Sequence, residues 1–295
     1  MRLHKFLIIL TIAVLLILTV AVWFSPSNGD FKTENFFWNG TRDILVNHAA
    51  LPIESLKELP ISPHGTTLIL IPYLALTDSE LAALNTFVRK GGSLILADDY
   101  GHGNQILEYL GLRARFAEQA LLDPLSNYKN QWFPRIVHIQ TSPLTINTGS
   151  LVFNHATSLV NVEKTDTIAL SSMFSFLDQN DNKKQDDGEP TGPLPVISQH
   201  KLGSGQITLI SDPSIFINSM QALGSNSNFV KNIAAATSSH LIIDQSHLTP
   251  SNLHYAKNLL KRSRGLLTAP LGILLLVISV LVFTLLPIWR KKSAG

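Results

Sequence analysis

The hydrophobic pattern is clearest between residues 66 and 99. Two apolar runs, Leu68–Ile71 and Ser93–Ala97, lack polar alternation. Such runs are typical of strands that are covered on both faces, as in parallel sheets. Between them, Thr77 and Glu80 have the spacing of a helix capping box, apolar residues then recur at helical spacing, and Gly91 ends the segment. This pattern predicts a strand, helix and strand that form a right-handed parallel crossover.

The rest of the chain alternates between weaker helical and strand patterns. We expect helices at residues 36–49, 104–110, 228–236 and 251–264, the last one capped by Thr249. We expect a short strand followed by a turn within residues 51–59, and strands at residues 136–140, 150–153, 166–171, 193–200, 206–211 and 241–244. The strands 193–200 and 206–211 would form a hairpin. Together these elements predict an α/β fold: a mostly parallel sheet between helices, in three layers, with an antiparallel hairpin added.

Two long apolar segments lie near the ends of the chain. Phe6–Phe24 has no charge over about 19 residues, which is long enough to cross a bilayer. A cleaved signal peptide is the alternative, but the apolar run is longer than usual and no small-x-small site follows it. A second apolar segment spans residues 266–286. We therefore expect an anchor at 1–25, an extracytoplasmic domain at 30–248, a juxtamembrane helix at 249–265 and a transmembrane helix at 266–289.

Basic residues indicate how these segments would lie in the membrane. Arg2 and Lys5 precede the first span, and Arg290–Lys292 follow the second. By the positive-inside rule this places both termini in the cytoplasm and the central domain outside the cell membrane. Four basic residues between positions 257 and 264 oppose this orientation, so the inverted orientation stays open.

Composition excludes several classes of function. The 295 residues carry a formal net charge of only +2, so no general nucleic-acid surface is indicated. The absence of cysteine excludes disulfides, a thiol nucleophile and thiolate metal sites. Mean hydropathy is +0.19, which agrees with a chain that contains membrane segments.

Several candidate binding residues follow directly after predicted strands. In open α/β sheets, ligands bind at the carboxyl ends of the strands. Asp98 and Asp99 follow the strand at 93–97, and Asp212 follows the strand at 206–211. Asp244 and His247 follow the last strand and have the residue types of a carboxylate that orients an imidazole general base. Turn capping and ordinary loop roles are the alternative for all five residues.

The segment Asp178–Glu189, DQNDNKKQDDGE, has the ligand spacing of a calcium loop. Such a loop of 12 residues offers oxygen ligands at positions 1, 3, 5, 7, 9 and 12. These positions are held by Asp178, Asn180, Asn182, Lys184 through its carbonyl, Asp186 and Glu189. The sequence therefore predicts a structural Ca²⁺ ion in an insertion before the hairpin.

Two departures from the calcium pattern leave an alternative open. Position 6, which is normally glycine, is Lys183, so a residue with a Cβ would have to make the sharp turn. Position 8 is Gln185 where an aliphatic residue is usual. The alternative interpretation is a solvated acidic turn.

Other motifs are too incomplete to predict chemistry. Gly101-His102-Gly103 lies between a strand and a helix but lacks the third glycine of a phosphate loop, so a plain turn is expected. Histidines recur at 240, 247 and 254, but this is not the spacing of a zinc site. Ser204 lies in a hairpin turn and not in a nucleophile elbow.

Four segments between the two apolar spans resemble a known family. They are PYLALTDSELAALNTFVRKGGSLILADDYG, SFLDQNDNKKQDDGEPTGPLPV, GSGQITLISDPSIFINSM and IIDQSH. They resemble a prokaryotic membrane-anchored family of unknown function whose outer domain is similar to the class I glutamine amidotransferase-like fold. They are also similar to the auxiliary component of gliding-motility ABC transport systems.

The resemblance implies a degenerate, non-catalytic domain. Amidotransferases place a cysteine in the turn after a central strand, where this chain has Asp98-Asp99-Tyr100. Gln245 stands where the resemblance leads us to expect an acidic residue. Partners implied are membrane-complex proteins associated with a MoxR-type ATPase. We therefore expect an accessory or binding module of a membrane complex; the alternatives are a metal-dependent hydrolase using Asp98, Asp99, Asp244 and His247, and a transporter subunit.

Overall fold

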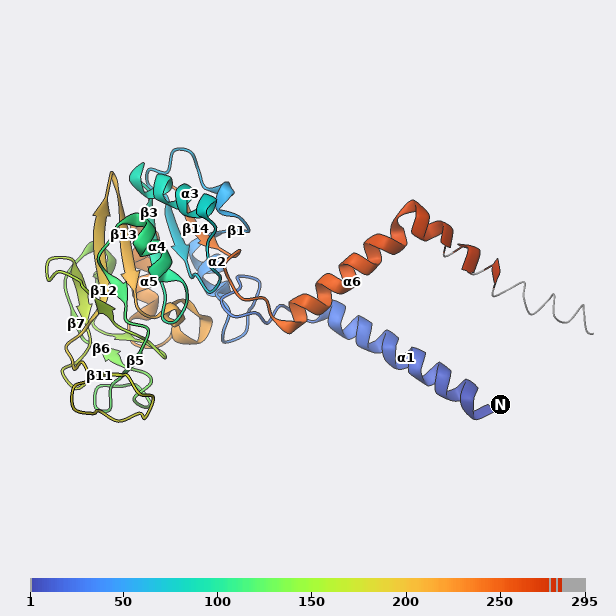
Figure 1. Ribbon diagram of the computed structural model, residues 1–295, viewed down its shortest axis with the longest axis horizontal. Helices are drawn as coiled ribbons and strands as arrows, with labels where there is room; N and C mark the ends of the chain where they lie inside the picture. The colour runs from blue at the N-terminus through green and yellow to red at the C-terminus, as the bar shows by residue number, and fades with distance from the viewer. Residues whose placement is uncertain (1, 276, 280, 283–295) are drawn as a thin grey trace, which may run out of the picture. The chain divides into compact units, whose positions relative to one another are not determined.

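The computed structural model describes the chain except for residues 1, 276, 280 and 283–295. It divides into two compact units, which we describe separately. The helical unit joins Met1–Ser27 to Pro250–Gly295, and the α/β unit is Asn28–Thr249. Figure 1 shows the elements of each unit by label.

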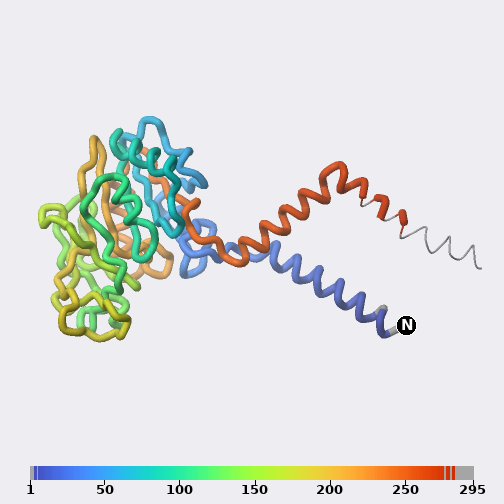
Figure 2. Tube along the Cα trace, viewed as in Figure 1, coloured from blue at the N-terminus to red at the C-terminus, as the bar shows by residue number. Residues whose placement is uncertain are grey.

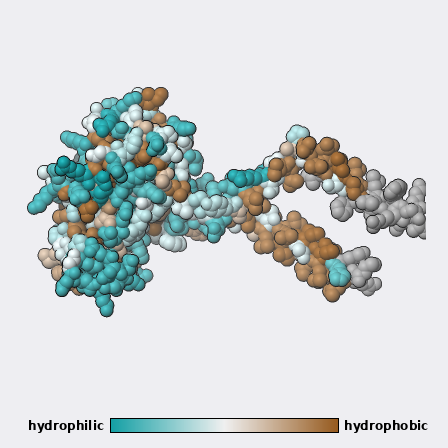
Figure 3. All heavy atoms as spheres, in the orientation of Figure 1, coloured by the Kyte–Doolittle hydropathy of each residue, from teal (hydrophilic) through white to brown (hydrophobic). Residues whose placement is uncertain are grey.

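Helix α1 (Arg2–Phe24) is the apolar element of the helical unit. Its segment Phe6–Phe24 has 19 residues, a mean hydropathy of 3.0 and no part buried inside the structure. By length and composition it can cross a membrane, and a signal sequence meets the same criteria. Figure 3 shows this helix as an almost continuous hydrophobic surface.

Helix α6 (Asn252–Thr268) has its N-cap two residues later than predicted. Ser251, and not Thr249, caps it, because its hydroxyl accepts a hydrogen bond from His254 N at 3.2 Å. The helix ends before Pro270, where it meets Pro270–Ser279 at a bend of 74°. The predicted span 266–286 is therefore broken near its start, because proline cannot continue the helical hydrogen bonding. Its residues 276, 280 and 283–286 lie outside the described part of the chain.

The α/β unit contains a mixed sheet and four longer helical segments, with several short strands. Its elements in chain order are α2 (Arg42–His48), β1 (Leu51–Ile53), η1 (Leu56–Glu58), β2 (Thr67–Leu70), α3 (Asp78–Arg89), β3 (Ser93–Ala97), α4 (Gly103–Leu110), β4 (Arg115–Phe116), β5 (Ala120–Leu122), β6 (Arg135–Ile136), β7 (His138–Ile139), η2 (Pro143–Thr145), β8 (Leu151–Val152), β9 (Leu159–Val160), β10 (Thr167–Leu170), β11 (Phe176–Asp178), β12 (Pro195–Leu202), β13 (Gly205–Ile210), η3 (Pro213–Phe216), η4 (Asn218–Met220), α5 (Asn226–Ala236) and β14 (Leu241–Asp244).

The main sheet has eight strands in the order β1-β14-β2-β3-β13-β12-β10-β7. Strands β1, β14, β2, β3 and β13 run parallel, whereas β12, β10 and β7 add antiparallel pairs at one side. The hairpin β12–β13 turns at Gly203, whose φ of +63° suits a glycine. The prediction of a mostly parallel α/β sheet with an added antiparallel hairpin is confirmed.

Helices cover both faces of the central strands, as the uninterrupted apolar runs predict. Along β2, Leu68 and Leu70 pack on the face that is covered by α3 and α4. Ile69 packs on the opposite face, with Ile44 of α2 and Phe229 of α5. Because successive side chains of a strand point to opposite faces, each buried strand contributes to two cores.

The predicted helix at 36–49 is wrong in its first half. Helix α2 begins only at Arg42, and the preceding residues form a loop. Gly40 lies so close to the backbone of Asn35 that a Cβ would stand 1.8 Å from the Asn35 carbonyl oxygen. The close approach of these two loop segments excludes a helix through this region.

Candidate functional site

The carboxyl ends of the parallel strands carry all five of the predicted binding residues. Parallel strands have their carboxyl ends on the same side of a sheet. The residues after these strands therefore lie in one row, which we call the carboxyl edge: Asp98, Asp99, Asp212, Asp244 and His247. Asp98, Asp99, Asp212 and Asp244 are buried, and so is His247. Contacts divide these residues into two groups.

Asp98 uses its carboxylate to hold the turn that leads into α4. Its Oδ1 accepts hydrogen bonds from Asp99 N at 2.9 Å and Gly101 N at 2.8 Å, and its Oδ2 accepts one from Gly103 N at 2.6 Å. A Cβ at either glycine would lie within 2.6 Å of this carboxylate. The Gly-x-Gly sequence thus makes room for the protein's own carboxylate, and the plain turn that we predicted is confirmed.

Asp99 and Asp212 form the centre of the first group, together with Tyr73. Asp99 Oδ1 accepts hydrogen bonds from Tyr100 N at 2.7 Å and from the Tyr73 hydroxyl at 3.3 Å. Asp212 accepts one from Asn154 N at 2.7 Å and one from Ser214 N at 2.7 Å. These bonds satisfy the carboxylates through neutral donors, without a cation.

The first group is electrostatically unfavourable because three carboxylates share a buried edge. Burial raises the pKa of Asp98 to about 7, and repulsion from Asp99 adds to the effect. Burial raises the pKa of Asp212 to about 8, again with repulsion from Asp99. The pKa of Asp99 is raised by burial as well. Burial also raises the pKa of Tyr73, and the negative charges of these three carboxylates raise it further.

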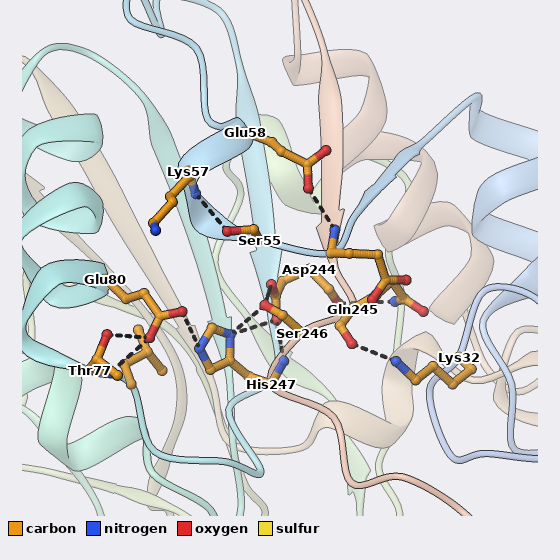
Figure 4. Close-up of polar contacts among 12 residues, drawn as sticks. Lys32, Ser55, Lys57, Glu58, Thr77, Glu80, Asp244, Gln245, Ser246 and His247 are labelled. Carbon is orange, nitrogen blue, oxygen red and sulfur yellow. Dashed lines mark hydrogen bonds and ion pairs between the residues drawn. The ribbon is translucent and has the colours of Figure 1, made fainter. Parts of the chain in front are cut away.

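The second group centres on His247 and is shown in Figure 4. The imidazole Nδ1 lies 3.0 Å from Asp244 Oδ2, and Nε2 lies 3.7 Å from Glu80 Oε1. Ser246 Oγ donates to Asp244 Oδ1 at 2.6 Å. The other Glu80 oxygen caps α3 by accepting from Thr77 N at 2.9 Å, which confirms the predicted capping interaction.

Charge pairing dominates the second group. Burial opposes the ionised forms, but the hydrogen bond and charge of Asp244 raise the pKa of His247 above its usual value. For Asp244, the hydrogen bonds from His247 and Ser246 outweigh burial and lower its pKa. The imidazole held between two carboxylates ties the end of β14 to helix α3, which is a structural role that its contacts account for.

The loop after β2 separates the two groups. Tyr73 contacts Asp99 on one side, while Leu74 N donates to His247 O at 2.9 Å on the other. Strands β3 and β14 also flank β2, so their ends lie about 10 Å apart. In the part of the chain that the structure describes, no hydrogen bond or ion pair joins the two groups. The arrangement therefore gives no support to a hydrolase site that combines Asp98, Asp99, Asp244 and His247.

The predicted calcium ligands converge within their loop. The side-chain amides of Asn180 and Asn182 donate to Asp186 Oδ2, at 2.8 and 2.5 Å. Asp178 Oδ2 accepts from Lys183 N at 2.8 Å. Lys183, at the position that is normally glycine, has a φ of +64°. The backbone thus makes the sharp turn despite the Cβ, and β11, which pairs with β5, begins the loop.

The other loop ligands have separate contacts. Glu189 accepts hydrogen bonds from Gln179 N at 2.8 Å and from Asp186 N at 3.0 Å, so it closes the loop end to end. The Lys184 amide donates to Asn182 Oδ1. Across the described residues, no group of three or more His, Asp or Glu side chains has the geometry to hold a metal ion.

Two site residues were not identified from the sequence as binding-site partners. Tyr73 lies two residues after the predicted strand run Leu68–Ile71, and Glu80 is predicted only as part of a helix capping box. Both are paired with residues far away along the chain, so local spacing carries no signal for either contact. Their positions follow from strand order, which brings the β2–α3 loop between β3 and β14.

Fold and site together define an α/β domain with an acidic carboxyl edge, in a chain that also has an apolar N-terminal helix. Residues 40–234, more than half of the chain, match DUF4350, a domain of unknown function. The chain therefore belongs to the DUF4350 family. This agrees with the expected family of unknown function.

Solved structures with a similar fold are distant. The mmIFT52 N-terminal domain is 13% identical with a TM-score of 0.43, and the match covers 68% of this chain and 81% of that chain. A ThuA-like protein from Bacteroides uniformis is 12% identical with a TM-score of 0.35, over 62% and 73% of the two chains. A β-galactosidase from Bacillus circulans sp. alkalophilus is 14% identical with a TM-score of 0.36, over 57% of this chain and 22% of that chain.

These similarities transfer no activity to the chain, because every TM-score is below 0.5 and every identity is below 25%. The match also spans less than a quarter of the β-galactosidase. A comparison with curated protein sequences found no match. The function must therefore be argued from the residues of this chain.

Proposed function

We propose that this protein is a membrane-anchored binding module of a prokaryotic envelope complex, and that it has no catalytic activity of its own. Its α/β unit would bind a partner protein at the carboxyl edge of the sheet. The resemblance of its four sequence segments to auxiliary transport components supports this class of partner, including a complex associated with a MoxR-type ATPase.

One observation carries the proposal. The carboxylates of Asp98 and Asp212 accept three and two hydrogen bonds from backbone N–H groups of the protein itself. Buried groups held in this way fix the turns at the edge of the sheet, whereas an acid or base must be free to reach a substrate. A rigid edge beside exposed Tyr100 suits recognition.

Site-specific photo-crosslinking tests the partner surface. A benzophenone amino acid would replace Tyr100, which is 47% exposed at the edge, or Tyr109, which is 45% exposed near the end of α4. Both variants of the full chain are irradiated in native membranes. We expect a discrete crosslinked product from position 100 that is absent from position 109. Equal products at both positions, or none at either together with a lone monomer in mild detergent, would contradict the proposal.

We further propose that Phe6–Phe24 is an uncleaved anchor, that the segment from residue 266 is a second span, and that the α/β unit lies outside the cell membrane. The basic residues at the two ends of the chain support this orientation. Protease added to intact cells is expected to digest the α/β unit. Digestion only after the vesicles are opened would reverse the orientation, and a mature chain that lacks the first helix would identify a signal peptide.

We propose a structural Ca²⁺ ion in the loop Asp178–Glu189. The proposal is supported by ligand spacing, by the contacts of Asn180 and Asn182 with Asp186, and by the positive φ at Lys183. A cation there would replace hydrogen bonds between ligand side chains with ion–oxygen contacts. Such an ion would hold the insertion in place without taking part in a reaction.

Calcium titration of the full chain in detergent tests this site. We expect heat of binding and a higher Tm at millimolar calcium, and loss of both in Asp186→Ala. Asp187→Ala is the matched control, because this neighbouring carboxylate is exposed and occupies no ligand position. An identical response of the two variants, or no response of the unmodified chain, would remove calcium from the proposal.

A further inference from the structure

Three consecutive aromatic residues are exposed on one loop of the α/β unit. Phe36, Phe37 and Trp38 are 57%, 40% and 67% exposed. The two phenylalanine rings lie 4.4 Å apart, so their exposed parts form one apolar surface. Clustered exposed aromatic residues mark an interaction site, whereas single exposed apolar residues are ordinary.

The backbone beneath these side chains is fixed. Ser219 N donates to Trp38 O at 3.0 Å, and Asn218 Nδ2 donates to Phe37 O at 2.6 Å. Buried Asn35 donates to Gly29 O at 2.8 Å and accepts from Phe37 N at 2.9 Å. The loop therefore presents its aromatic side chains outward on a rigid frame, so a partner can cover them without ordering the backbone.

The chain that connects this loop to the apolar helix is short. Helix α1 ends at Phe24, and the frame of the loop already includes Gly29. Only residues 25–28 lie between them, and the five residue steps from Phe24 to Gly29 span at most about 18 Å. The chain leaves the α/β unit at the same place, since Gln245 accepts hydrogen bonds from Lys32 Nζ at 2.5 Å and Thr33 N at 2.9 Å. Figure 2 shows these N-terminal and C-terminal segments side by side.

The end of α1 is surrounded by features of a membrane interface. Within the helical unit, Lys257 Nζ donates to Ser25 O, and the Arg264 guanidinium lies 5.8 Å from the Trp23 ring. Cationic side chains beside an interfacial tryptophan suit anionic lipid headgroups. The polar region on each side of a bilayer is roughly 5–7 Å thick, which is within the reach of the short connection.

We propose that Phe36, Phe37 and Trp38 form a lipid-docking loop that inserts into the headgroup region of the same membrane that holds α1. Aromatic side chains are favoured at that depth because their rings are apolar while the indole N–H can meet water. The inference rests on the proposed anchoring by α1 but does not depend on which side of the membrane carries the α/β unit. Docking would hold the carboxyl edge at a defined height for a partner.

Spin labels test the depth of the loop, and the lack of cysteine allows single labels in the full chain. Glu34→Cys places a label in the loop and leaves all three aromatics intact. Ile61→Cys is the matched control: it is 87% exposed and precedes β2, at the opposite edge of the sheet. Leu16→Cys reports on the anchor. Each variant is reconstituted into vesicles of phosphatidylcholine and phosphatidylglycerol, and accessibility to oxygen and to a nickel complex is measured by electron paramagnetic resonance.

We expect the oxygen-to-nickel accessibility ratio at position 34 to exceed that at position 61 several-fold, and to fall to the control value when Phe36 and Trp38 are both replaced by serine. Equal ratios at 34 and 61, with a deep label at 16, would overturn the docking loop and leave the anchor intact. A label at 16 exposed to water would overturn both. Shielding of position 34 from both reagents would show that protein covers the loop, which would overturn the lipid assignment.

Discussion

Replacement of Asp99 by asparagine tests whether buried carboxylate repulsion limits the stability of the α/β unit. Asp99 Oδ1 accepts from Tyr100 N and from the Tyr73 hydroxyl, and an asparagine oxygen can accept both bonds. The substitution therefore removes a charge while it keeps the local hydrogen bonds. It also removes one cause of the raised pKa of Asp212.

The direction of the effect follows from proton linkage. The folded-state pKa of Asp212, about 8, lies above the unfolded value near 3.9, so the folded state binds more protons between these values. The contribution of Asp212 to stability is therefore fully present at low pH and is lost as pH rises through about 8. One pKa unit corresponds to about 1.4 kcal/mol. Removal of the Asp99 charge relieves its repulsion of Asp212 as well as its own burial cost, so it should stabilise the fold at pH 8, by about 1–3 kcal/mol as is usual for single substitutions of this kind.

Urea unfolding of the full chain in mild detergent, followed by circular dichroism, measures this effect. We expect Asp99→Asn to raise the free energy of unfolding at pH 8 and to leave it almost unchanged at pH 4.5. Asp187→Asn removes the same charge from an exposed position and should have little effect at either pH. A loss of stability in Asp99→Asn at pH 8, or an equal gain at both pH values, would refute the reasoning.

Three further substitutions probe other contacts. His247→Gln should lower the free energy of unfolding in urea by about 1–2 kcal/mol near pH 5.5 and by less at pH 9. The raised pKa of His247 makes a contribution to stability that is present below pH 6.5 and is lost as pH rises through the folded-state pKa. A pH-independent loss would contradict this. Asn226→Ala should lower the free energy of unfolding by about 2–4 kcal/mol, because the buried Asn226 side chain accepts a hydrogen bond from Val152 N at 3.0 Å and donates one to Val152 O at 2.9 Å. A Tm within error of the unmodified chain would show these bonds to be dispensable. Gly205→Ala would place a Cβ 2.2 Å from two backbone oxygens and should lower Tm by several degrees, whereas Gly149→Ala has open space and should not.

Local patterns predicted the central elements because those elements are specified by their own residues. The apolar run at 93–97 is strand β3, and the run at 241–244 is β14. Glycine at 111, with a φ of +75°, ends α4 as expected. The failure at 36–49 arose from tertiary contacts, since Asn218 and Ser219 hold residues 35–40 as a loop.

The candidate site was partly predictable for the same reason. A sheet of parallel strands places the residues after each strand on one edge, so the positions of Asp98, Asp99 and Asp212 follow from the strand assignments. Which of these residues meet depends on strand order, which links segments far apart in the chain. The separation of Asp244 from Asp98, and the pairing of His247 with Glu80, required that order.

By itself, the sequence determined the apolar N-terminal helix, the strands buried on both faces, the capped helix α3 and the acidic character of one sheet edge. Each depends on interactions between residues close together in the chain. Only the tertiary structure decided that Asp212 binds the backbone of Asn154, that His247 lies between Asp244 and Glu80, and that Phe36, Phe37 and Trp38 are exposed on a rigid frame. These features depend on burial and long-range hydrogen bonding, which arise only when distant segments pack together.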